Sequence, residues 1–247
     1  MSGGARALAL PAALLLAAEI VLRLGGTTSD ALAPPSAVAR ALLALLADGA
    51  LMQASAATLA AALGGLMVGG GIGLLLGLLF GALPPLARLF AIAVEAVRPI
   101  PAVALIPLAL ILFGFGYRLE ISIVAFAAIW PMLVFTQAAV AGVEPRLLEV
   151  ARALRLSLAA RLVKIVIPSA LPRIFVAFRL AAGVALIVAV TVEIAVNPLG
   201  LGYGMTMAQQ TLRPAEMLAY LVWIGVVGWL LNLALLALQR RAFGRFM

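Results

Sequence analysis

The chain has 247 residues, of which 66% are hydrophobic and only 11% charged, and its formal net charge is +8. A soluble domain has about a quarter of its residues charged, and it could not bury several apolar runs of bilayer-spanning length at once, so this composition excludes an ordinary soluble protein. The sequence has no cysteine and no histidine, which excludes disulfides, thiolate metal sites and histidine-based catalysis.

The hydropathy pattern predicts an all-α, polytopic membrane protein of about six transmembrane helices. Residues 7–22 resemble a signal peptide but lack a clear cleavage site, so we expect a first membrane helix there. A short helix over residues 38–46 follows Pro34-Pro35-Ser36 and is too short to span. The other spans are expected at residues 53–81, 86–113, 121–143, 171–195 and 215–238, joined by a turn at 114–120, a polar interval at 144–168 and a Gly-rich loop at 197–214.

The third span is interrupted by Arg98-Pro99-Ile100-Pro101 and again by Pro107. Each proline removes a backbone donor, and hydrocarbon offers no replacement partner for the carbonyl that loses its bond. We therefore expect a broken helix that lies against protein or water.

The basic residues are distributed unequally over this map, and membrane topology explains the positive charge better than nucleic-acid binding does. Of the 17 Lys and Arg residues, eleven fall on one side, four on the other and two, Arg98 and Arg179, within spans. The excess on one side predicts that both termini are cytoplasmic. The eleven are Arg6, Arg88, Arg146, Arg152, Arg155, Arg161, Lys164, Arg173, Arg240, Arg241 and Arg245, and the four are Arg23, Arg40, Arg118 and Arg213.

A glycine recurs at every fourth position of the second span. These residues place a groove without side chains along one helix face, so another helix can approach closely. Tight packing is the favoured interpretation, and a seam on which helices slide is the alternative. The glycines are Gly65, Gly69, Gly73, Gly77 and Gly81.

The polar interval contains apolar residues at helical spacing, which predicts an amphipathic helix outside the bilayer within residues 145–165. Such a helix lies on anionic headgroups or docks into a groove of a cytoplasmic partner. The apolar positions are Leu147, Val150, Ala151, Leu154, Leu158, Leu162 and Ile165.

This interval resembles the cytoplasmic EAA loop of ABC importer permeases, in which Glu-Ala-Ala is followed after three residues by Gly and nine residues later by Ile-x-Leu-Pro. Here Glu149, Ala151, Ile165 and Pro168 are in register, whereas Val150, Arg155 and Ile167 replace the family's Ala, Gly and Leu. Further segments are similar to the nitrate, sulfonate, taurine and bicarbonate branch: residues 34–36, 98–107, 112–116, 192–194 and 200–204.

The resemblance implies a type I ABC importer permease, with residues 1–247 forming one transmembrane domain and residues 144–168 its coupling loop. The chain would need no cofactor of its own, because ATP and Mg would bind partner ATPase subunits. Its other partners would be a substrate-binding protein outside, a second permease copy, as homodimer or heterodimer, and the lipid bilayer of the bacterial inner membrane. The residues implied in ATPase coupling are Glu149, Ala151, Arg152, Leu154, Arg155 and Ser157.

In the family, the glycine at this position allows the loop to bend. The bulk and charge of Arg155 imply either an altered fit to the ATPase or a transporter that contains two unlike permeases. Glu149 and Arg152 are expected to be polar anchors, with Leu154 in the ATPase groove.

Ionisable residues within spans are energetically costly and suggest function. Glu95 and Arg98 lie three residues apart, so they can pair on one helix face, and Arg98 is the residue expected to attract an anionic solute. Glu193 is either part of the same pathway or close enough to the outer boundary to reach water. Glu19 also lies near the outer boundary and could simply reach water. The predicted pathway residues are Glu95, Arg98, Pro99, Pro101 and Glu193.

The chain contains no G-x-x-x-x-G-K-[ST] phosphate loop, and its single lysine is Lys164, so it is not predicted to be the ATPase or an enzyme. An ion-coupled secondary transporter is the alternative, although no convincing internal repeat supports it. An intramembrane protease would need a histidine or an embedded aspartate pair.

Overall fold

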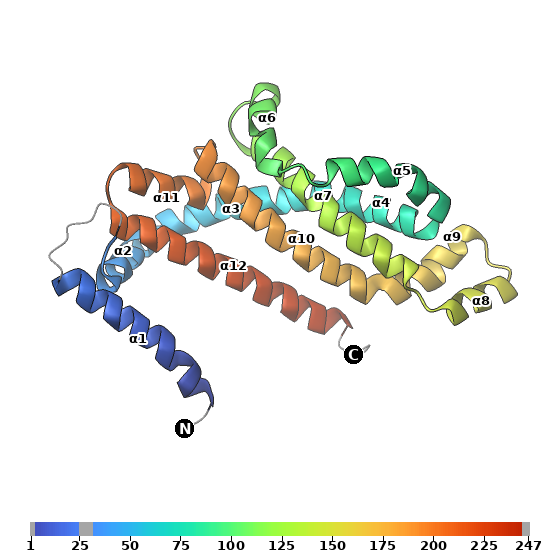
Figure 1. Cartoon of the computed structure of the whole chain (residues 1–247), viewed down its shortest axis with the longest axis horizontal. Helices are drawn as coiled ribbons and strands as arrows, with labels where there is room; N and C mark the ends of the chain where they lie inside the picture. The colour runs from blue at the N-terminus through green and yellow to red at the C-terminus, as the bar shows by residue number, and fades with distance from the viewer. Residues whose placement is uncertain (1–2, 25–31, 244–247) are drawn as a thin grey trace.

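A computed structural model of the chain describes residues 3–24 and 32–243, and within them every regular element is helical (Figure 1). Arg245 and the side chain of Arg6 lie outside what the structure describes. The elements are α1 (Gly3–Leu24), α2 (Pro35–Ala47), α3 (Ala50–Gly65), η1 (Leu66–Gly70), α4 (Gly71–Ala82), α5 (Pro84–Val97), η2 (Ala102–Leu105), α6 (Ile106–Phe113), α7 (Tyr117–Ala141), α8 (Pro145–Ala153), α9 (Leu158–Arg161), η3 (Leu162–Val166), α10 (Ile167–Ala195), α11 (Gly200–Gln210) and α12 (Pro214–Phe243).

The all-α, polytopic membrane fold predicted from the sequence is confirmed. Among the described residues, four helical stretches are long and apolar enough to cross a membrane, and a fifth is the pair formed by α5 and η2–α6, which is bent by 78°. This bend coincides with the predicted break at residues 98–101. The four straight candidates are 50–82, 117–141, 158–210 and 214–242, and α1 is a further helix of 22 residues.

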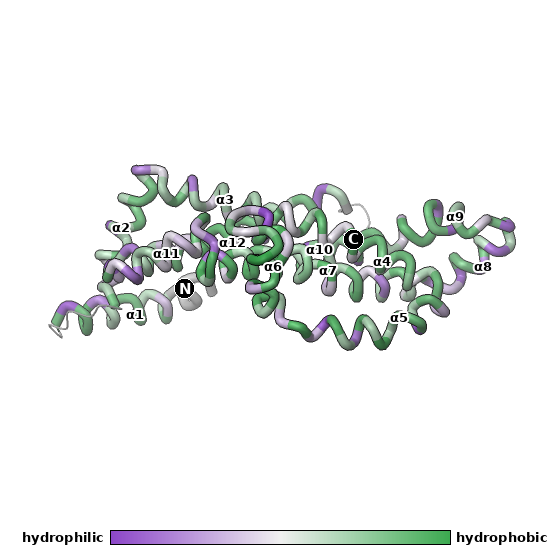
Figure 2. The backbone as a smooth tube through the Cα atoms, turned by 90° about the horizontal axis from the view of Figure 1, so that it is seen from above, coloured by the Kyte–Doolittle hydropathy of each residue, from purple (hydrophilic) through white to green (hydrophobic). Residues whose placement is uncertain are grey.

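Helices α7 and α10 form the centre of the molecule, with α3 and α4 against α7 and α12 beside α10 (Figure 1). Alanine and valine make most of the contact between α7 and α10. Side chains of this size let the helices approach closely, so van der Waals contacts hold them together where lipid supplies no hydrophobic driving force. Hydrophobic residues run along these helices, while the loop around α8 and α9 is more hydrophilic (Figure 2). The buried centre includes Val124, Ala128, Ala139, Ala170, Ala177, Ala181, Ala185 and Ala189.

The five regularly spaced glycines all face α7. A Cβ at Gly77 would lie 2.6 Å from the Thr136 Cβ, and one at Gly81 would lie 2.6 Å from the Val140 Cβ. At Gly69 a Cβ would collide with the Ala125 carbonyl oxygen. The partner positions rise along α7 as the glycine numbers rise, so the two helices run parallel. The π-helical turn η1 lies within this face, where it adjusts the register of the contact.

Two predicted connections are wrong because parts of them are helical. The turn expected at residues 114–120 ends earlier, since Gly114 and Gly116 with positive φ complete it and α7 begins at Tyr117. The loop expected at residues 197–214 contains α11, which starts at Gly200 with φ of +83°. The buried Leu201 fixes α11 against its neighbours, a tertiary contact that the glycine-rich sequence does not reveal.

Glu19 connects α1 to α2 and does not simply reach water. Its carboxylate pairs with Arg23 and accepts a hydrogen bond from the Ser36 backbone N–H at 2.9 Å. This N–H belongs to the first turn of α2, where backbone donors have no partner within the helix. The carboxylate therefore caps α2 from another helix.

The glycine face yields a first prediction. Gly77→Leu should destabilise the protein by about 2 kcal/mol, because the added side chain forces α4 away from α7. Gly71→Leu is the matched control, since a Cβ at Gly71 meets nothing within 4 Å. Thermal unfolding in lipid measures both, and equal shifts for the two variants would contradict this packing.

Candidate functional site

Helix α8 lies at one end of the long axis, beyond the ends of α7 and α10 (Figure 1). Pro145 occupies its first turn, where a proline needs no partner for the missing N–H. Ala151 is 1% exposed, so α8 has a buried side, whereas Leu154 is 64% exposed. Glu149 and Arg152 are exposed as well, so α8 presents polar and apolar side chains on an open surface.

The amphipathic helix predicted within residues 145–165 is present as α8, but it covers only the start of that interval because α8 stops at Ala153. The Leu156 N–H donates to the Ala151 carbonyl at 3.0 Å, and the Arg155 N–H donates to the Arg152 carbonyl at 2.9 Å. These two bonds define a Schellman motif, in which the residue that follows the C-cap of the helix adopts a left-handed conformation. Arg155 has φ of +51°, a conformation that glycine adopts without steric cost.

The structure thus gives a reason for the glycine that the resemblance places at position 155. Arginine keeps the bend, at the cost of an L-residue in the left-handed region. Ser157 then starts the next helix, since its hydroxyl accepts a hydrogen bond from the Ala160 N–H at 3.3 Å. Of the predicted coupling residues, Ala151 is thus buried, Arg155 is a helix stop and Ser157 is a helix cap, while Glu149, Arg152 and Leu154 are exposed.

The loop is attached to both central helices. Arg173 on α10 donates from Nη1 to the Gly142 carbonyl at 3.0 Å, which supplies a partner for a carbonyl at the end of α7. Val143 is buried beside it. The segment that leads into α8 is thus joined to α10.

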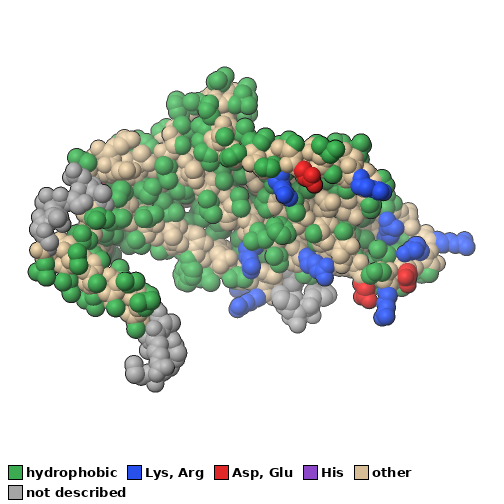
Figure 3. Space-filling model, viewed as in Figure 1, with side chains coloured by type: hydrophobic (Ala, Val, Ile, Leu, Met, Phe, Trp, Pro, Cys, Tyr) green, Lys and Arg blue, Asp and Glu red, His purple; other side chains and the backbone are tan. Residues whose placement is uncertain are grey.

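Basic side chains gather at the end that carries α8 and α9, as Figure 3 shows for one face of the molecule. This is the side on which the sequence places most arginines. The same view shows few charges over the opposite end.

A second candidate region is a cavity of about 370 Å³ between α5 and α7, lined by Glu95, Arg98 and Gln137 among other residues. The structure thus brings Glu95 and Arg98 into one cavity. Glu95 and Arg98 do not form an ion pair with each other. The ion pairs of the described residues are Glu19–Arg23 and Arg213–Glu216. Pro99 and Pro101 lie in the bend at the end of this cavity, where Arg98 ends α5.

Glu193 lies elsewhere and does not reach water, which corrects that alternative: it is 2% exposed. Its Oε2 accepts a hydrogen bond from the Gly202 N–H at 2.8 Å, and the Thr58 hydroxyl accepts one from the Leu201 N–H at 2.9 Å. Both donors belong to the first turn of α11. Glu193 is therefore a buried cap of α11 and not a residue of the cavity with Glu95 and Arg98.

Sequence reasoning missed Glu120 and Asn197. Glu120 is fully buried and accepts a hydrogen bond from Asn197 Nδ2 at 2.7 Å, while Asn197 Oδ1 accepts one from the Gly116 N–H at 2.9 Å. A carboxylate four residues into an apolar helix was the available signal, but the turn expected at residues 114–120 hid it.

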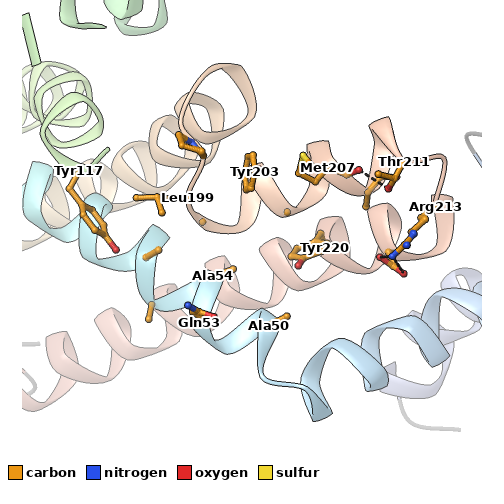
Figure 4. A pocket seen from close by; sticks show the side chains of 17 residues that line it. Ala50, Gln53, Ala54, Tyr117, Leu199, Tyr203, Met207, Thr211, Arg213 and Tyr220 are labelled. Atoms are coloured by element: carbon orange, nitrogen blue, oxygen red, sulfur yellow. Dashed lines mark hydrogen bonds and ion pairs between the residues drawn. The ribbon is translucent and has the colours of Figure 1, made fainter. Parts of the chain in front are cut away.

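A third candidate region is a cavity of about 770 Å³ beside α3 and α11 (Figure 4). Alanines from α3 form one wall, and Leu199, Tyr203 and Met207 contribute another. Arg213 and Glu216 pair at 3.3 Å on its boundary. The cavity is amphipathic and large enough for a small solute.

A bundle of apolar helices with a broken span, a cavity with charged residues beside the break and an exposed amphipathic helix at one end is the arrangement of a membrane transport permease. The chain belongs to the family of binding-protein-dependent transport system inner membrane components, which residues 69–246 match. It is an ABC importer permease of the nitrate, sulfonate, taurine and bicarbonate branch, and a multi-pass inner-membrane protein.

Two relatives illustrate the similarity. A Bacillus subtilis protein named as an aliphatic sulfonates transport permease, SsuC, is 28% identical over 239 residues, which cover 97% of this chain and 87% of that protein. The Escherichia coli taurine transport system permease protein TauC is 31% identical over 215 residues, which cover 85% and 78%. The fold matches a chain of the inward-facing MetNI methionine ABC transporter with a TM-score of 0.67 at 22% identity, covering 77% of this chain and 95% of that one.

The Schellman motif yields a second prediction. Arg155→Gly should stabilise α8 against local opening by about 1 kcal/mol, because glycine removes the left-handed penalty. Arg152→Gly, inside α8, should destabilise it by a similar amount. Amide hydrogen exchange over residues 145–157 measures both, and shifts of the same sign would show that Arg155 does not stop this helix as described.

Proposed function

We propose that α8 is the element through which cytoplasmic ATPase subunits drive this permease. The observation that carries the proposal is a short exposed helix with a fixed C-terminal end: Ala151 is buried, and the Schellman bonds stop α8 at Ala153. A groove on a partner recognises such a helix by its apolar and charged side chains. ATP and Mg would then be bound by the ATPase, and this chain would hold no cofactor.

The orientation follows from the charge distribution. Basic residues are retained on the cytoplasmic side of membrane proteins, and they gather at the α8–α9 end (Figure 3). This supports cytoplasmic termini and a cytoplasmic coupling loop. The opposite end, which carries α2 and α11, would then face a substrate-binding protein outside.

The solute pathway would pass the bend between α5 and α6. A helix break exposes backbone groups that only protein or water can satisfy, and the cavity with Glu95, Arg98 and Gln137 lies beside it. Arg98 would attract a small anion there. The sulfonate and taurine permeases among the relatives support an anionic group on the solute, and a second permease copy would complete the pathway. Family membership disfavours the ion-coupled alternative.

Charge reversal in α8 gives a third prediction. Glu149→Arg should lower binding of the cognate ATPase in lipid by about tenfold or more, because it places a like charge beside the basic side chains of the loop. Glu216→Arg at the opposite end is the matched control, and its loss of an exposed ion pair should cost little. Copurification and ATP hydrolysis measure both. Retained binding by Glu149→Arg, or equal loss in both variants, would refute docking through α8.

Removal of the cavity charge gives a fourth prediction. Arg98→Gln should lower uptake of an anionic solute by roughly tenfold while ATPase binding is unchanged, because the cavity loses its positive group. Arg88→Gln is the control, since Arg88 lies on the same helix α5 and does not line this cavity. Uptake into vesicles with the full transporter decides, and equal uptake by wild type and Arg98→Gln would exclude Arg98 from the pathway.

A further inference from the structure

Two buried carboxyl groups meet where α7, α10 and α11 converge. Glu120 is 0% exposed and Glu193 is 2% exposed, and the two groups are neighbours. Each has one anchored oxygen: Asn197 Nδ2 donates to Glu120 Oε2 at 2.7 Å, and the Gly202 N–H donates to Glu193 Oε2 at 2.8 Å. The other oxygen of each, Oε1, is buried and has no hydrogen-bond partner among the protein's described groups.

Two negative charges cannot both persist in this place. A single buried carboxylate costs several kcal/mol unless it is paired with a cation or fully hydrogen-bonded, and a second one beside it adds repulsion. Neither group forms an ion pair, since the ion pairs of the described residues are Glu19–Arg23 and Arg213–Glu216. At least one of the two carboxyl groups must therefore have its charge neutralised.

We propose that Glu120 and Glu193 bind one proton between the two oxygens that have no other partner, so that the pair carries one negative charge. Nothing in the importer function requires this site. A proton fits better than a metal ion, because the described residues contain no group of three or more acidic side chains that could hold one. With the proton, Oε1 of one group donates to Oε1 of the other, and both unpartnered atoms are satisfied.

The surroundings assign the proton to Glu120. Glu193 faces the first turn of α11, where unpaired N–H groups and the helix dipole favour an anion. Glu120 accepts only from the neutral amide of Asn197, which stabilises negative charge less. The neutral Glu120 carboxyl therefore donates to the Glu193 carboxylate, and the bridge holds α11 against α7 and α10.

Exchange of each carboxyl for an amide tests this assignment. Glu120→Gln keeps a donor toward Glu193, so its unfolding midpoint in lipid should stay near that of wild type. Glu193→Gln leaves Glu120 neutral and removes the anion that accepts from the first turn of α11, so it should lower the midpoint by roughly 5 °C or more. Infrared spectra should show a protonated carboxyl C=O band in wild type that Glu120→Gln lacks and that the control Glu216→Gln, at a partly exposed carboxylate, keeps.

Each outcome is decisive. Equal stability of the two amide variants, or greater loss in Glu120→Gln, would overturn the placement of the proton on Glu120. A carboxyl band unchanged in Glu120→Gln would overturn the shared proton. A sodium-dependent rise of the unfolding midpoint in wild type, absent from both variants, would show that a metal ion occupies the site instead. None of these measurements involves the ATPase, so they succeed or fail independently of the coupling role of α8.

Discussion

Backbone groups at a helix end have no water to bond within a membrane, and this constraint shapes the breaks inside the bundle. The structure meets it with side chains from distant segments. A carboxylate or hydroxyl caps the first turn of α2 and of α11, an amide oxygen accepts from the turn before α7, and a guanidinium donates to the carbonyl that follows α7. The capping residues are Glu19, Thr58, Arg173, Glu193 and Asn197.

These caps give the molecule a rigid centre and defined ends. The glycine face packs α3 and α4 closely against α7, and α7 in turn packs on α10. Force applied at α8 would reach both central helices through Val143 and the Arg173–Gly142 bond. The cavity beside the proline break borders α7, so a shift of α7 would reshape it. Closure of ATPase subunits could thus act on the pathway through one helix.

The sequence predicts what local patterns determine. Apolar runs locate the spans, and prolines locate the bend after Arg98, because both depend on neighbouring residues alone. It does not predict α11, whose glycine-rich sequence favours a loop until Thr58 and Glu193 cap its first turn. It also hides the stop at Arg155, because the Schellman motif here contains an arginine where the pattern expects glycine. In the first case a long-range contact overrides local preference, and in the second a left-handed residue does so.

The most direct test of the account uses the absence of cysteine from the chain, since Leu154→Cys then carries the only thiol. Labelling with a membrane-impermeant maleimide should occur in inside-out vesicles, fail in right-side-out vesicles and fall sharply when the cognate ATPase is bound. That result would locate α8 on the cytoplasmic side and beneath the ATPase in one experiment. Labelling from outside, or labelling that bound ATPase leaves unchanged, would contradict the coupling role of α8.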